Sequence, residues 1–194
     1  SQKGSYLGPY WSTDQIEKWL KKKGYKYHRH TPDEILDVAS DALINEKVLG
    51  WFSGRMEFGP RALGARSIIG DARSPQMQSV MNLKVKYRES FRPFAPSVLV
   101  EDVNEYFELD RPSPYMLLVA PVRKERCKEI PGRHERPLRE WVNEVRSDVP
   151  AITHVDYSAR VQSINKLDNP DYHAVIDAFK QRTGYGIIIN TSFN

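Results

Sequence analysis

Helix-like and strand-like patterns alternate along this chain of 194 residues, and the alternation restricts its fold more than any other feature. Capping-box patterns that begin at Ser12 and Thr31 predict two helices near the start. Near the end, a helix is expected over residues 170–183, which stops at Gly184 and leads into an apolar strand. Such an alternation predicts a single α/β or α+β sheet domain.

Short apolar runs between turn residues predict the other strands. The run at residues 115–122 has the clearest pattern of a core strand. Residues 103–109 are expected to be helical, whereas the highly charged residues 123–150 are expected to form an excursion or lid with one short helix around Trp141. The remaining strands are expected at residues 25–28, 48–52, 95–100, 152–155 and 159–164.

The composition excludes several classes of protein. Hydrophobic residues make up 40% of the chain and charged residues 28%, which is too apolar for a disordered tail. No run approaches the roughly 20 apolar residues that span a bilayer, and the first residues lack the apolar core of a secretory signal. The single Cys127 cannot form an internal disulfide, and His28 and His30 have no further metal ligands nearby. We therefore expect a cytoplasmic protein with no metal site in this chain.

Both ends of the sequence suggest a piece of something longer. The chain does not begin with Met, and it stops in the polar turn that follows the last apolar strand. We expect residues 1–194 to be one domain excised from a longer protein.

Basic charge is concentrated in one segment. Residues 54–92 contain eight Lys and Arg against three acidic residues, a surplus larger than the net charge of +4 of the whole chain. The same segment carries turns with Gly and Pro. This concentration indicates an anion site rather than a generally basic surface.

Residues 54–67 leave an apolar strand through three glycines and carry three arginines. Glycines let backbone amides approach a ligand, and Arg matches phosphate or carboxylate oxygens with two parallel hydrogen bonds. The alternative is a loop whose arginines pair with acids such as Glu57 and Asp71, and charge alone favours neither interpretation. The spacing fits neither a P-loop nor a dinucleotide-binding turn.

Residues 82–94 form a second basic segment. If residues 83–88 are extended, Lys84, Lys86 and Arg88 share one face, where their charges repel unless water or an anion neutralises them. The alternative is an edge strand whose lysines prevent aggregation. Two weaker polar segments are residues 156–161, with Arg160, and residues 190–194, at the carboxyl end of a strand where ligands of α/β sheets bind.

Four motifs occur in this order: GRMEFGPRALGARSI, NLKVKYRESFRPFAPS, SARVQ and NTSFN. Together they resemble the carboxy-terminal domain of the NodU/CmcH-type O-carbamoyltransferases, from about residue 6 to the end. That domain is similar to YrdC, which implies a twisted mixed sheet flanked by helices. YrdC-like proteins carry a Lys-x-Arg pair and a late Ser-x-Asn, and here Lys86 with Arg88 and Ser192 with Asn194 stand in those places.

The resemblance implies one half of a two-step reaction. This domain would join carbamoyl phosphate to ATP, with Mg²⁺, and form carbamoyl-adenylate. A separate amino-terminal domain, which holds an iron ion and the acceptor, would then move the carbamoyl group to a hydroxyl. The expected partners are these small molecules and that domain, and neither nucleic acid nor a membrane.

The residue chemistry suits this task, because positioned cations stabilise the negative charge that develops on a pyrophosphate leaving group. Lys86 and Arg92 are expected to hold the nucleotide phosphates. Arg61 and Arg88 are expected to hold carbamoyl phosphate or its carbamoyl end. The expected catalytic residues are Arg61, Lys86 and Arg88.

Smaller contributions are expected from the last two motifs. Arg160 is expected to clamp the α-phosphate, and Ser192 and Asn194 to bind phosphate or the carbamoyl amide by hydrogen bonds. Tyr157 departs from the family pattern, in which a glycine precedes the arginine by three residues. A tyrosine resists the positive φ that glycine allows, although it could stack on adenine.

Two other functions compete with the enzyme. An RNA- or tRNA-binding module would use the basic segment, but the surplus is small and lacks interleaved aromatic residues. A steep salt dependence of RNA binding would favour that module. A non-catalytic scaffold that orients the amino-terminal domain would bind no nucleotide.

Overall fold

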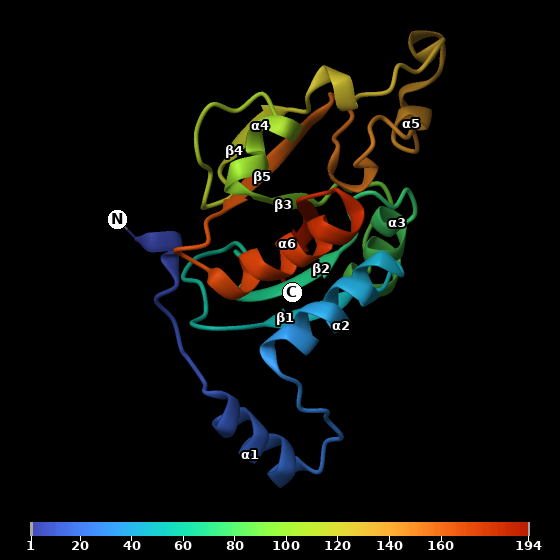
Figure 1. The fold of residues 1–194 in the computed structure, drawn as a ribbon. Helices are drawn as coiled ribbons and strands as arrows, with labels where there is room; N and C mark the ends of the chain where they lie inside the picture. Colours follow the sequence, from blue (N-terminus) through green and yellow to red (C-terminus); the bar gives the residue numbers. More distant parts are fainter. Residues whose placement is uncertain (1, 194) are drawn as a thin grey trace.

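A sheet of six strands in the order β1-β2-β6-β3-β5-β4 organises the computed structural model, which describes residues 2–193 (Figure 1). Strands β3 and β5 are parallel, and all other neighbours are antiparallel. The prediction of one mixed sheet flanked by helices is therefore confirmed, and the sheet is open. The strands are β1 (Leu49–Phe52), β2 (Arg66–Gly70), β3 (Ala95–Leu99), β4 (Leu118–Pro121), β5 (Ser158–Ile164) and β6 (Ile187–Thr191).

Helices cover both faces of the sheet because the central strands are apolar on both sides. Helices α2 (Pro32–Ile44) and α6 (Pro170–Thr183) pack with Ile188 in one core. Helices α3 (Met77–Met81) and α4 (Val103–Tyr106) contribute to a second core with Ile187 and Ile189. Successive side chains of a strand point to opposite faces, so β6 joins the two cores.

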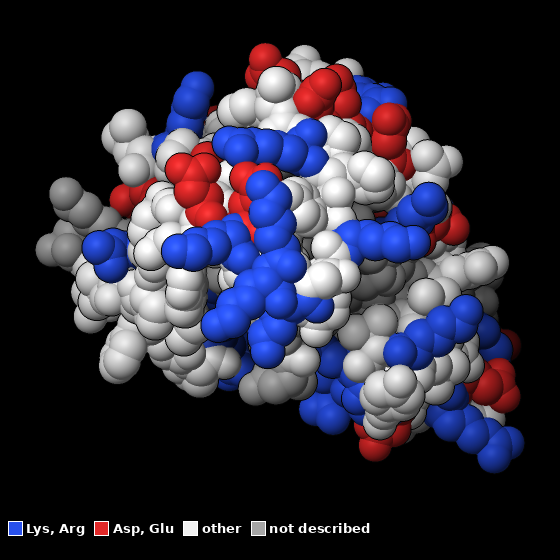
Figure 2. Space-filling model, turned by 90° about the horizontal axis from the view of Figure 1, so that it is seen from below, with Lys and Arg blue, Asp and Glu red and all other residues white. Residues whose placement is uncertain are grey.

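Helix α1 (Thr13–Lys23) lies apart from the sheet (Figure 1). Its predicted capping box at Ser12 is present, and Gly24 ends it with a left-handed φ of 70°. None of its residues is buried, and its last turn carries Lys21, Lys22 and Lys23. Seen from below, the side on which α1 lies, the surface gathers many Lys and Arg side chains (Figure 2).

Two predicted strands are wrong. Residues 25–28 form no strand and lie beside α1, where the Tyr27 hydroxyl donates a 2.7 Å hydrogen bond to Glu17, away from the sheet. Residues 152–155 form a turn into β5, because the His154 amide donates to the Ser158 carbonyl at 2.8 Å. Neither segment pairs with a strand of the sheet.

Three other predictions are too generous. The run at residues 115–122 is not a core strand, since only β4 forms there, at the sheet edge, with Ala120 buried and Val119 59% exposed. Strand β1 is the opposite edge and only half-buried. The helix expected over residues 103–109 ends at Tyr106. Apolar residues form an edge strand as readily as a central one, so the pattern does not distinguish the two.

The charged residues 123–150 contain only short helical turns, including α5 (Leu138–Trp141), the short helix expected around Trp141. Arg146, 2% exposed, ties this segment to the body by donating hydrogen bonds to the carbonyls of Trp141 at 2.6 Å and Thr153 at 3.0 Å. Within residues 2–193, no helix has the length and apolar character needed to cross a bilayer.

Candidate anion-binding site

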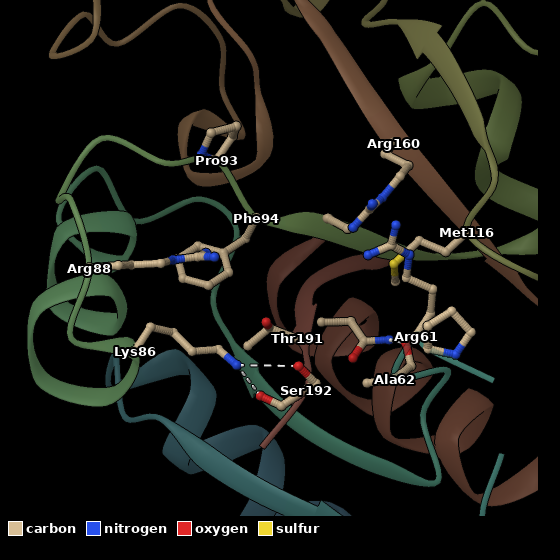
Figure 3. Close-up of a pocket in the computed structure, with 13 residues that line it drawn as sticks. Arg61, Ala62, Lys86, Arg88, Pro93, Phe94, Met116, Arg160, Thr191 and Ser192 are labelled. Carbon is tan, nitrogen blue, oxygen red and sulfur yellow. Dashed lines mark hydrogen bonds between the residues drawn. The ribbon is translucent and has the colours of Figure 1, made fainter. Parts of the chain in front are cut away.

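One cavity of about 160 Å³ lies where β6 ends beside the start of β3. All four motifs contribute to its lining, although they are far apart in the sequence. Lys86 and Arg88 reach it from one side, and Arg61 and Arg160 point toward each other on the other side (Figure 3). The fold thus brings four of the predicted cations together.

The loop that carries Arg61 is built around a buried carboxylate. Glu57 is 4% exposed, and its Oε1 accepts hydrogen bonds from the backbone amides of Leu63 at 2.6 Å and of Ala65 and Arg66 at 3.3 Å. Residues 60–62 therefore bulge into the lining of the cavity. Glu57 thus organises the loop through three backbone amides, and its contacts in the alternative interpretation, with arginine side chains, are not the ones observed.

The arginines of residues 54–67 have different roles. Arg61 lines the cavity. The acid Asp71 named in the alternative interpretation is paired at 2.7 Å with Arg73, which lies outside this segment. Arg66 lies over the Phe52 ring at 3.5 Å and donates to the Ser53 carbonyl at 3.0 Å, so its role is structural.

The second basic segment is not extended, so the predicted alternation over residues 83–88 is wrong. Residues Asn82–Lys86 form a π-helical turn, η2, that ends at Tyr87 with a left-handed φ of 51°. This reversal lets Lys86 and Arg88 line the same cavity, whereas Lys84 is exposed and does not line it. Short π-helical segments are frequent at functional sites.

Asn82 explains why the chain turns here. Its side chain is fully buried and donates hydrogen bonds to the carbonyls of Ser90 at 3.0 Å and Arg92 at 2.8 Å. Its Oδ1 accepts a 2.6 Å hydrogen bond from Arg88 Nε. One buried amide therefore fixes both ends of the loop and the guanidinium between them.

Arg160 enters the cavity from β5. Burial, and then repulsion from Arg61, lower the pKa of its guanidinium below the ordinary value. Its Nε is buried and has no hydrogen-bond partner among residues 2–193. A buried donor of this kind suits a ligand oxygen.

Tyr157 takes the conformation that it was expected to resist. Its φ is 65°, and its hydroxyl donates a 3.3 Å hydrogen bond to the Lys128 carbonyl. The Arg133 guanidinium lies 5.1 Å from the ring centroid. These contacts with the charged segment hold the left-handed turn, and the ring does not line the cavity of the cations.

The end of β6 supplies the polar side of the cavity. Lys86 Nζ donates to the Ser192 carbonyl and lies 3.4 Å from its Oγ (Figure 3). Asn194 lies outside the described residues. The sequence analysis placed Asn190 in the polar segment 190–194 but gave it no role, although it directly follows three isoleucines and lines the cavity. A polar side chain continuing a buried apolar run was the available signal.

Arg92 does not line this cavity, but it lines an adjoining one of about 380 Å³ together with Arg61, Arg88 and Arg160. His154 also lines the adjoining cavity, and burial lowers the pKa of its imidazole below the ordinary value. The two cavities share three arginines, so they form one continuous site.

The electrostatics of the site are those of an anion receptor. Burial first, and then Arg88, lower the pKa of Lys86; burial and then Arg92 do the same for Arg88. No carboxylate from residues 2–193 lines either cavity. Several cations that line one site and lower the pKa of their neighbours favour a ligand with several negative charges.

The described residues include no group of three or more His, Cys, Asp or Glu that could hold a metal ion. A Mg²⁺ ion at this site would therefore take its ligands from nucleotide phosphates and water, as Mg²⁺ commonly does.

Comparison with known proteins covers most of the chain. The family model described as carbamoyltransferase C-terminus matches residues 40–194. An uncharacterized protein of Synechocystis sp. is 53% identical over 194 residues, which cover 98% of this chain and 32% of that protein. Nodulation protein NolO of Bradyrhizobium diazoefficiens is 44% identical over 97% of this chain and 32% of its own length.

A 3'-hydroxymethylcephem-O-carbamoyltransferase of Streptomyces clavuligerus is 39% identical over 80% of this chain and 26% of its own length. The chain thus spans about a third or less of the length of these curated relatives.

Proposed function

The chain belongs to the carbamoyltransferase C-terminus family, and from that premise we propose that its cationic site binds carbamoyl phosphate and ATP and forms carbamoyl-adenylate. The observation that carries the proposal is the convergence of Arg61, Lys86, Arg88 and Arg160 on one cavity. ATP and carbamoyl phosphate together bring several negative charges, which match these cations.

The proposed reaction consumes one carbamoyl phosphate, one ATP and one water. Water replaces phosphate on the carbamoyl carbon, so that carbamate and inorganic phosphate form. A carbamate oxygen then attacks the α-phosphorus of ATP. The bond from this phosphorus to the bridging oxygen breaks, and pyrophosphate leaves.

In this reaction the protein supplies position and charge rather than covalent chemistry. Lys86 and Arg92 hold the nucleotide phosphates, and Arg61 and Arg88 hold carbamoyl phosphate. Arg160 faces the α-phosphate through its unpartnered Nε, and Ser192 accepts or donates at the phosphate. When bound, Mg²⁺ would neutralise part of the charge on the leaving pyrophosphate.

The carbamoyl group would pass from this domain to a hydroxyl acceptor. The curated relatives are about three times as long as this chain, which leaves room for a further domain. In the proposal, that domain receives the carbamoyl group and holds the expected iron ion and acceptor.

Calorimetric titration with ATP, with and without Mg²⁺, tests binding. Lys86→Met is expected to weaken ATP binding by about 10- to 100-fold, because a hydrogen bond to a charged group is lost. Lys84→Met is the matched control, since Lys84 is exposed and does not line the cavity. This control is expected to bind ATP within about 2-fold of the wild-type affinity.

A second assay tests the chemistry by measuring pyrophosphate release, which must depend on carbamoyl phosphate. Binding without release would refute the catalytic part of the proposal. A folded protein that binds no nucleotide would refute all of it and favour the scaffold.

A further inference from the structure

The cavity contains one buried acceptor among its donors. Asn190 lines it and is 1% exposed, yet its Oδ1 accepts no hydrogen bond from residues 2–193. Buried carboxamide oxygens are normally paired, so an unpaired one on a residue that lines a cavity requires an explanation.

The orientation of the Asn190 amide is fixed by its neighbours. Its Nδ2 donates to the Ala62 carbonyl at 3.0 Å and to Gln162 Oε1 at 2.7 Å, which uses both of its hydrogens. Gln162 is fixed in turn, because its Nε2 donates to the Leu63 carbonyl at 2.9 Å. Two backbone carbonyls therefore anchor the pair, and a flipped Asn190 would place its oxygen against two acceptors.

The network extends away from the cavity and is fully buried. Ser97 Oγ donates to Gln162 Oε1 at 2.7 Å and accepts from the Tyr172 hydroxyl at 3.1 Å. Gln162, Ser97 and Tyr172 are each 0% exposed. The hydrogen bonds of this network all use other atoms, so Asn190 Oδ1 has no partner among residues 2–193.

A carbamoyl group is the fragment that this atom fits. It differs from an acetyl group of nearly the same shape by carrying N–H donors in place of a methyl group. Lys and Arg only donate, so the four cations can bind phosphate and carbonyl oxygens but cannot bind an N–H. The hydroxyls of Thr191 and Ser192 can rotate to donate or accept, whereas the Asn190 oxygen can only accept.

Given the proposed function, we infer that Asn190 Oδ1 accepts an N–H of the carbamoyl group and makes the site selective for carbamoyl over acyl phosphates. Asn190 also holds the Ala62 carbonyl beside Arg61. This hydrogen bond therefore fixes the Asn190 amide relative to the backbone next to Arg61, which binds phosphate in the proposal.

The test compares three ligands by calorimetry: carbamoyl phosphate, acetyl phosphate and inorganic phosphate. The wild-type protein is expected to bind carbamoyl phosphate about 10- to 100-fold more tightly than acetyl phosphate, because acetyl phosphate leaves the buried oxygen unpaired. Asn190→Leu is expected to bring the two affinities within about 2-fold of each other while inorganic phosphate still binds.

Ser97→Ala is the matched control. It disturbs the same buried network but does not line the cavity, so it is expected to lower stability and keep the preference for carbamoyl phosphate. The wild-type comparison needs no substitution, so the inference can be tested even if Asn190→Leu does not fold.

The outcomes separate this inference from the proposed function. If the wild-type protein binds all three phosphates without preferring the carbamoyl compound, or if Asn190→Leu keeps the preference, the inference is overturned and the anion site stands. If the wild-type protein binds none of them, both are overturned.

Discussion

The loop that carries Lys86 and Arg88 depends on Asn82, so removing the Asn82 side chain is expected to lower both the free energy of unfolding and the affinity for ATP. Asn82→Ala deletes three hydrogen bonds: two from Nδ2 to the carbonyls of Ser90 and Arg92, and one from Arg88 Nε to Oδ1. A neutral hydrogen bond contributes about 1 kcal/mol net, and the half-exposed charged one about 1.5 kcal/mol. The free energy of unfolding is therefore expected to fall by about 3 to 4 kcal/mol.

The functional effect follows from the same contacts. Without the buried amide, the carbonyls of Ser90 and Arg92 lose their donor and the Arg88 guanidinium loses its acceptor, so Lys86 and Arg88 are no longer held together in one cavity. The affinity for ATP is expected to fall by about 10-fold or more under conditions where the variant is folded. Urea unfolding followed by tryptophan fluorescence gives the stability, and calorimetry gives the affinity.

Two further variants make the reasoning refutable. Asn45→Ala removes a side-chain hydrogen bond of 2.8 Å at an exposed helix end, and it is expected to change stability by less than about 1 kcal/mol. Asn82→Asp keeps the acceptor for Arg88 but loses both donations, so it separates the two effects. If Asn82→Ala matches the wild type in both stability and ATP affinity, Asn82 does not hold the loop.

Two other predictions concern the frame of the site. Gly64 has a φ of 98°, and an added Cβ would lie 2.1 Å from Tyr172 Cδ1, so Gly64→Ala is expected to lower the free energy of unfolding by about 3 kcal/mol; an unchanged melting temperature would contradict this. Burial lowers the pKa of His154, so the unfolded chain takes up a proton first and stability falls as the pH drops below about 6.5. His154→Gln is expected to lose less stability than the wild type between pH 7 and pH 5, and equal losses in urea unfolding would argue against the buried imidazole as the cause.

The sequence predicted the elements whose signals are local. Ser12 and Thr31 cap α1 and α2 through their own side chains, and Gly184 ends α6 with a φ of 80°. The position of a strand within the sheet is not local. The run at residues 115–122 was expected in the core. Its apolar pattern does not show whether the strand has a neighbouring strand on both sides or only on one.

Charge indicated the basic residues of the candidate site, whereas the roles of the uncharged Asn82 and Asn190 were not predicted. Lys86 and Arg88 were expected in one site, and the structure brings both to one cavity, although the assumed strand was wrong. The π-helical turn depends on contacts of Asn82 with residues eight and ten positions away, which no periodicity reveals. Asn190 was included in a polar segment but received no role, because the pairing of its amide is known only once the fold has placed Ala62 and Gln162 beside it.

The cost of holding charged side chains in this site links the stability of the fold to anion binding. Burial first, and then neighbouring cations, lower the pKa of Lys86, Arg88 and Arg160, so keeping these side chains charged opposes folding. A polyanion that binds only the folded chain reverses this and adds about 2.7 kcal/mol at 100 times its dissociation constant. Phosphate or sulfate buffers are thus expected to raise the measured free energy of unfolding above its value in a buffer without these anions. Replacing one of these arginines with a neutral residue is expected to weaken anion binding and to raise the free energy of unfolding of the ligand-free chain.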